Sequence, residues 1–291
     1  MQLTLINKNN QVLDLLNNRD KFILSAAEGL HGIETDIATS ETPYTDGATI
    51  DSVKALPRGI ELTFTLRGNI KESIDYFTSI VKSKQYVTLR EIEGDRDIII
   101  KGIATIPPYS RMQKTCKIAL SIYCGQPYWE SANYIIETIS EYVNLLTFPQ
   151  AGQYFPITGR PFGEMDIGLT KNFNNNGDTA VGMLINLVAM GEVVNPRISC
   201  STGEQNGWYM QLNLSLKLND ILEINTVKGQ KYITINGLDT YNEEPILNYL
   251  EWHGEDWLQL ETGANTFSVT TSGGETNSNL YFNLICKGRY E

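Results

Sequence analysis

Apolar and polar residues alternate along much of the chain, which predicts short β-strands with one buried face. Residues 60–67 read Ile-Glu-Leu-Thr-Phe-Thr-Leu-Arg and alternate without a fault. Residues 221–225 and 232–235 are two further β-rich runs. The second of them stops at Asn236-Gly237, the dipeptide best suited to a two-residue hairpin because both residues tolerate positive φ. Strands and turns at this spacing predict an antiparallel meander, and its apolar face needs a second layer to cover it.

One segment departs from this period and predicts a helix over residues 70–82. Its apolar residues recur at helical spacing, and Asn69 followed by Glu72 is typical of a capping box. The apolar positions are Ile70, Ile74, Phe77, Ile80 and Val81. We therefore expect one amphipathic helix on an otherwise β-rich domain.

The length of 291 residues allows two domains, each with its own core. We expect a mainly β protein of two antiparallel β-sandwich domains, over residues 1–130 and 161–291, with residues 131–160 as a connector. The charge changes at the same place: residues 1–130 carry 15 Lys and Arg against 16 Asp and Glu, and the remainder carries 8 against 18. An excess of acidic residues argues against binding nucleic acid, which needs clustered Lys and Arg.

The four cysteines predict buried free thiols. Cys116 and Cys124 fall on the apolar face of a predicted strand, about 26 Å apart along it, too far for a disulfide. Cys200 and Cys286 each lie alone in strand-like surroundings, and no C-x-x-C pair occurs. We therefore expect no metal or redox site.

Catalytic chemistry has few candidates in this sequence. His31 and His253 are the two histidines, so a Ser-His-Asp triad has at most two possible bases. His31 lies in Gly-Leu-His-Gly beside no nucleophile, which favours a loop residue. No glycine-rich phosphate motif occurs, and we expect neither an enzyme nor a cofactor. The chain also lacks a run of ~20 apolar residues and an N-terminal signal pattern, so we expect no membrane segment and synthesis in a cytoplasm.

Several short motifs in the second half occur in an order that is similar to the second domain of phage distal tail proteins. The front half resembles the ring domain of that family, since a long loop, a helix and a strand ending in Cys-Gly-Gln-Pro-Tyr-Trp (124–129) follow one another. The family usually has Pro-Gly-x-Asn where this chain has Thr262 before Gly263. The motifs are Asn176-Gly177-Asp178, Asn195-Pro196-Arg197-Ile198, Thr202-Gly203-Glu204, residues 219–226, Asn236-Gly237 and Thr262-Gly263-Ala264-Asn265.

This resemblance implies a structural baseplate hub in the virion tail. It implies a homo-hexameric ring that caps the tail tube, with a galectin-like (jelly-roll) second domain outside the ring. The partners it implies are further copies of the chain, the tail tube protein, a tail tip or tail-associated protein, and receptor-binding or fibre proteins.

Residues 38–57 show neither strand nor helix periodicity and contain two prolines, so we expect a long loop. Such loops are usually functional or disordered. Its apolar residues are Tyr44, Ile50, Val53 and Leu56. Because ring-forming tail proteins resemble one another in using a long loop here, we expect these four residues to be ordered by an adjacent subunit or by the tail tube.

A carbohydrate-binding adhesion module is the alternative function. Trp252, His253 and Trp257 lie close together in sequence and suggest a sugar or partner surface. Against a sugar site, Val193 stands two residues before Asn195, where galectins place a histidine. Packing of the two tryptophans against the sheet or a partner is the simpler interpretation.

Overall fold

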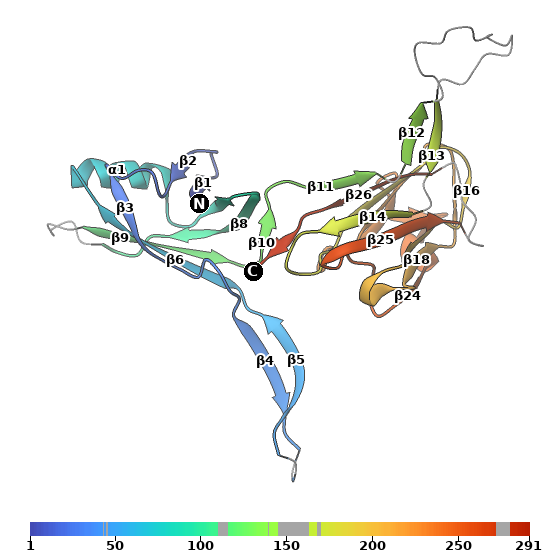
Figure 1. The fold of residues 1–291 in the computed structure, drawn as a ribbon, viewed down its shortest axis with the longest axis horizontal. Coiled ribbons are helices and arrows are strands. Elements are labelled where there is room, and N and C mark those ends of the chain that lie inside the picture. The colour runs from blue at the N-terminus through green and yellow to red at the C-terminus, as the bar shows by residue number, and fades with distance from the viewer. Residues whose placement is uncertain are drawn as a thin grey trace, which may run out of the picture. The chain divides into compact units, whose positions relative to one another are not determined.

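The computed structural model describes residues 1–42, 44, 46–109, 116–138, 140–144, 163–167, 170–271 and 280–291. The described residues are mainly β-strand with one α-helix, so the predicted fold class is confirmed (Figure 1). They form two compact units, one of residues 1–133 with 289–291 and the other of residues 134–288. In the described part of the chain, no helix is long and apolar enough to cross a membrane.

The first unit is built on a nine-stranded sheet in which every pairing is antiparallel. Seven strands follow the order β2-β1-β7-β8-β9-β6-β3, while β10 pairs with β8 and with β27. The strands are β1 (Gln2–Asn7), β2 (Val12–Asp14), β3 (Phe22–Glu28), β6 (Arg58–Leu66), β7 (Gln85–Glu93), β8 (Arg96–Thr105), β9 (Lys117–Cys124), β10 (Trp129–Ser131) and β27 (Arg289–Tyr290).

Helix α1 (Ile70–Ile80) covers one face of this sheet through its apolar side. Phe77 of the helix meets Phe22 and Phe64 of the sheet, with ring centroids 5.9 and 5.2 Å away. The predicted helix is therefore confirmed, but the capping box is wrong. Asn69 donates from Nδ2 to Glu72 Oε1 at 2.8 Å, and its side chain makes no hydrogen bond to the helix backbone.

The predicted register of the cysteine strand is confirmed. Cys116 and Cys124 are both buried, as are the residues between them on the same face, Ile118, Leu120 and Ile122. All four cysteines of the chain are free and buried. Burial raises the pKa of the Cys124 thiol to about 11, although Arg58 nearby acts in the opposite direction.

The second unit is a sandwich of two five-stranded antiparallel sheets around one apolar core. One sheet runs β11 (Ile135–Thr138), β26 (Leu280–Cys286), β15 (Leu184–Ala189), β20 (Ile221–Asn225) and β21 (Tyr232–Ile235). The other runs β14 (Thr170–Asn175), β25 (Gly263–Thr270), β17 (Arg197–Cys200), β18 (Tyr209–Leu212) and β24 (Leu250–His253). Short pairs and 3-10 turns complete it: β12 (Ser140–Asn144) with β13 (Gly163–Ile167), β16 (Val193–Val194) with β19 (Ser215–Leu216), β22 (Thr240–Tyr241) with β23 (Glu244–Pro245), η1 (Gly203–Gln205) and η2 (Ile246–Tyr249).

The turn after β21 has the geometry that its sequence demands. Asn236 and Gly237 adopt φ of 52° and 79°. The residues on either side, Ile235 and Leu238, exchange two backbone hydrogen bonds of 2.8 and 2.9 Å. These are the marks of a two-residue hairpin, so the predicted turn is confirmed.

The unit boundaries differ from the expected domain limits at two points. Strand β11 lies inside the expected connector, yet it pairs with β26 and belongs to the second unit. Strand β27 lies inside the expected second domain, yet Tyr290 pairs with Trp129 in the sheet of the first unit. Residues 145–160 of the expected connector lie outside the described residues.

Candidate functional site

A two-stranded hairpin, which we call the arm, projects from the first unit between β3 and β6 (Figure 1, blue). It consists of β4 (Thr35–Ser40) and β5 (Thr49–Ala55). The prediction of an irregular loop over residues 38–57 is therefore wrong. The physical reason is that every residue of β4, and all of β5 except Ala55, is exposed. A strand buried on neither face needs no alternation of apolar and polar residues, so its sequence carries no period.

The arm nevertheless has one apolar and one polar face. Ile37 pairs with Val53, and Thr39 pairs with Ile50 beyond a bulge, which places the three aliphatic side chains on the same face. Ile37, Ile50 and Val53 are 51%, 63% and 61% exposed. The other face carries the pairs Asp36–Lys54 and Ala38–Ser52. Apolar residues of this size, aligned on a face that no other part of the described chain covers, make this face a candidate interaction surface.

The four residues predicted to contact a neighbour divide between the arm and its base. Ile50 and Val53 lie on the apolar face, and Tyr44 lies at the tip, fully exposed with a φ of 74°. Leu56 lies at the base, half-buried, and its N–H donates to Glu34 O at 2.8 Å. Ile37 was missed because it precedes the segment that lacked periodicity, and its pairing with Val53 could not be read from the sequence.

Arg58 fixes the base of the arm to the first unit. Its buried side chain donates from Nε to Pro127 O at 2.6 Å and from Nη1 to Leu30 O at 2.5 Å. Trp129 donates from Nε1 to the same Leu30 carbonyl at 2.8 Å. Burial lowers the pKa of the Arg58 guanidinium. Gly29 completes the junction, because a Cβ there would lie 2.1 Å from the Gly59 carbonyl oxygen.

A cavity of about 270 Å³ lies at this base and includes His31 in its lining. His31 Nε2 lies 3.9 Å from Glu91 Oε2, a buried carboxylate. The lining residues offer no serine, threonine or cysteine nucleophile to His31. The sequence interpretation of His31 as a loop residue agrees with this position.

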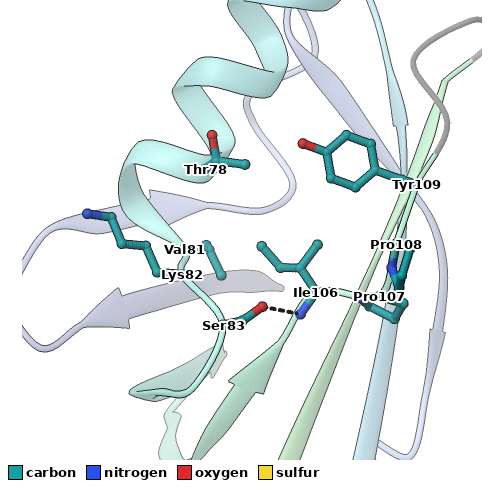
Figure 2. Close-up of a pocket in the computed structure, with 8 residues that line it drawn as sticks. All are labelled: Thr78, Val81, Lys82, Ser83, Ile106, Pro107, Pro108 and Tyr109. Atoms are coloured by element: carbon teal, nitrogen blue, oxygen red, sulfur yellow. Dashed lines mark hydrogen bonds between the residues drawn. The ribbon is translucent and has the colours of Figure 1, made fainter.

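A wider groove of about 520 Å³ lies between the end of α1 and residues 106–109 (Figure 2). Its walls are apolar where Val81, Ile106 and Pro107 meet, and Ser83 Oγ accepts a hydrogen bond from the Ile106 N–H at 2.9 Å. Lys82 is the charged group in its lining. No paired acid and base face this groove. Among the described residues, no group of three or more His, Cys, Asp or Glu is placed to hold a metal ion.

The three residues of the suspected sugar surface do not share one face. Trp252 pairs with the buried Met210, and His253 pairs with Tyr209, so the two side chains point to opposite sides of β24. Trp252 is 49% exposed. Trp257 is partly buried against the core, with Lys231 Nζ 5.5 Å from its ring centroid.

A polar network covers the sheet face on which His253 lies. The His253 ring stacks on Tyr209 with centroids 5.8 Å apart, and the Arg197 guanidinium lies 3.6 Å from the same Tyr209 ring. Tyr209 also donates to Glu251 Oε1 at 2.9 Å, and this bond raises the pKa of Tyr209. Sequence reasoning missed Arg197, Tyr209 and Glu251 as a group, because three separate strands bring them together.

Comparison with known proteins gives one family and several similar folds. Residues 176–284 match the model of the siphovirus-type tail component, C-terminal domain, named for the Dit protein of phage SPP1. The crystal structure of SPP1 Dit, described as a paradigm of the hub adsorption apparatus in phages that infect Gram-positive bacteria, is similar over 99% of both chains. Its TM-score is 0.62 at 12% sequence identity, which is a likeness of fold.

Chains of the phage P2 baseplate align over nearly the same length. The calcium form covers 98% of this chain and 97% of its own, with 12% identity and a TM-score of 0.42. The strontium form covers 99% of this chain and 98% of its own, with 12% identity and a TM-score of 0.41. No curated protein sequence matches the chain significantly.

Proposed function

We propose that this chain is a phage distal tail protein, a structural hub component of the baseplate, and that its copies assemble into a closed hexameric ring through the arm. The ring joins the tail tube protein to a tail tip or tail-associated protein. The second unit holds receptor-binding or fibre proteins. The role is geometric, without catalysis, cofactor, membrane or sequence-specific nucleic acid, and its place is the virion tail.

The observation that carries this proposal is the uncovered apolar face of the arm. A two-stranded hairpin is marginally stable in water on its own, and three exposed aliphatic side chains add surface that favours burial. A second copy can supply the cover, because each copy both donates an arm and offers a surface. Such a head-to-tail contact between unlike surfaces closes into a ring when its rotation allows.

The ends of the arm support the same role. Arg58 fixes the base by hydrogen bonds to two segments of the first unit, so the arm leaves the sheet from a defined position. At the far end, Tyr44 presents an aromatic ring with a polar tip to its surroundings. The arm is also acidic, since five carboxylates stand against Lys54 between residues 34 and 55: Glu34, Asp36, Glu41, Asp46 and Asp51. Residues 1–130 carry 15 Lys and Arg from which a complementary receiving surface can be built.

Native mass spectrometry of the purified full chain tests the proposal. We expect a species of six copies for the natural sequence. Replacement of residues 35–55 by a short Gly-Ser bridge should give a folded monomer whose far-ultraviolet β signal loses only the contribution of β4 and β5. A monomeric natural chain over the whole accessible concentration range would overturn the ring. Rings of undiminished stability after the replacement would remove the arm from the contact.

A further inference from the structure

An exposed apolar cluster lies at one end of the sandwich in the second unit. Two turns meet there, residues 217–220 before β20 and residues 235–238 after β21. The Asn236 side chain ties them together: Nδ2 donates to Asp220 Oδ1 at 2.8 Å, and Oδ1 accepts from the Ile221 N–H at 2.9 Å. Leu218 and Leu238 are thereby held on neighbouring turns.

The hairpin β22–β23 connects Leu238 to another exposed leucine, Leu247. Thr240 pairs with Pro245, and the Ile246 N–H donates to Asp239 O at 2.9 Å. Leu247 follows Ile246 in the 3-10 turn η2, so Leu238 precedes the hairpin and Leu247 comes after it.

Four aliphatic side chains are exposed across these turns, and we call them the apolar end patch. Leu218, Ile221, Leu238 and Leu247 are 62%, 48%, 63% and 55% exposed. Single exposed leucines are ordinary on a protein surface, but Leu218, Ile221 and Leu238 lie on segments that the Asn236 side chain joins by hydrogen bonds. Leu247 follows the adjacent hairpin. The clamp by Asn236 holds two of these turns in place before any partner arrives, which lowers the ordering cost of docking.

The rim of the patch is acidic and indicates what covers it. Asp220, Asp239, Glu243 and Glu244 lie on the same turns and hairpin, against Lys217 alone. The second unit of another copy is a poor occupant, because residues 131–291 carry 18 acidic against 8 basic residues. A different protein with Lys and Arg around an apolar centre complements both features.

We propose that the apolar end patch is the docking surface by which the second unit holds another tail component, one that presents apolar side chains within a basic rim. The inference rests on the proposed hub function, since it names the surface and the partner chemistry for that role. The apolar centre supplies the affinity. The acidic rim raises the association rate with a basic partner and repels acidic proteins.

The test measures binding of the full-length chain to each other tail protein of the same particle, purified one at a time. The variant is Leu218→Ser with Leu238→Ser, and the matched control is Ile136→Ser. Ile136 is 62% exposed on β11, the opposite edge strand of the same sheet. We expect one tail protein to bind the natural chain and the control alike, and the double variant at least about tenfold more weakly. Binding should also weaken as salt rises, and less steeply for Glu243→Gln with Glu244→Gln.

Three results would overturn the inference. In the first, the double variant and the control bind the tail protein equally well. In the second, the affinity does not change with salt concentration. In the third, no tail protein binds the natural chain. Native mass spectrometry of the same samples distinguishes a failure of this inference from a failure of the hub proposal. If the natural chain and the double variant form the same rings while binding is unaffected, the patch is refuted and the ring stands. If the double variant alone loses self-association, a second copy is the occupant and the inference fails.

Discussion

Replacing the apolar face of the arm by threonine should weaken assembly without unfolding the chain. The variant carries Ile37→Thr, Ile50→Thr and Val53→Thr. Threonine keeps the β-branched shape and the preference for strands, so the hairpin itself should persist. The change removes apolar surface from one face of an element whose residues already face solvent in the isolated subunit.

The magnitude follows from the exposure of the three side chains. Full burial of an Ile or Val side chain contributes about 1.5–3 kcal/mol. At 51–63% exposure, the three together have roughly 3–5 kcal/mol left to gain from a neighbour. Threonine retains one methyl group, so we expect a loss of about 2–3 kcal/mol per contact. That loss is roughly a 30- to 150-fold increase in the dissociation constant of each contact.

The assay is sedimentation velocity over a concentration series, with native mass spectrometry at the two ends. The matched control carries Ala38→Ser and Ser52→Thr, two small changes on the polar face of the same hairpin. We expect rings for the control at the concentrations of the natural chain, and monomers for the threonine variant there. Melting temperatures of dilute, unassembled samples should agree, because none of the three positions is buried within one chain. Rings of the threonine variant at an unchanged concentration would refute the reasoning, whatever its melting temperature.

Three further outcomes are expected. Burial raises the pKa of the Cys124 and Cys286 thiols to about 11, so the unfolded chain loses these protons first as the pH rises. The free energy of unfolding, measured by urea titration, should therefore fall between about pH 9 and 11 by roughly 1–3 kcal/mol per thiol. If the variant with Cys124→Ala and Cys286→Ala shows the same fall as the natural chain, this prediction is wrong. Arg58→Met should lower stability by roughly 3–5 kcal/mol, since it removes hydrogen bonds to buried carbonyls; a melting temperature equal to that of Arg67→Met would count against this role. A glycan array should show no binding, and a hit abolished by Trp252→Ala would restore the sugar interpretation.

The elements that sequence predicts well are those whose cause is local. The Asn236-Gly237 turn needs two residues with positive φ, and the sequence supplies them side by side. Helix α1 needs apolar residues at helical spacing, and the strand that ends at Cys124 needs alternation over one buried face. Each requirement is met within about ten residues, so the local sequence is sufficient to predict these elements.

The candidate functional surfaces were harder to predict because strand pairing between distant residues forms them. The arm is exposed on both faces, so no burial pattern marked its strands. Trp252 and His253 are neighbours in sequence, but alternation along β24 separates them. Arg197 and Tyr209 meet only through strand pairing. The pairing of Tyr290 with Trp129 spans most of the second unit, and two residues are too few to show a period.

The return of β27 to the first sheet has a mechanical consequence. The chain passes from the first unit to the second after residue 133 and comes back after residue 288. Because β10 and β27 are antiparallel partners, both covalent tethers leave the first unit from the same end of one ladder. A pull on the second unit is therefore shared by the two strands of this ladder. The whole second unit is, in topological terms, the loop of one hairpin, and the first sheet gains its last strand only after that loop has been synthesised.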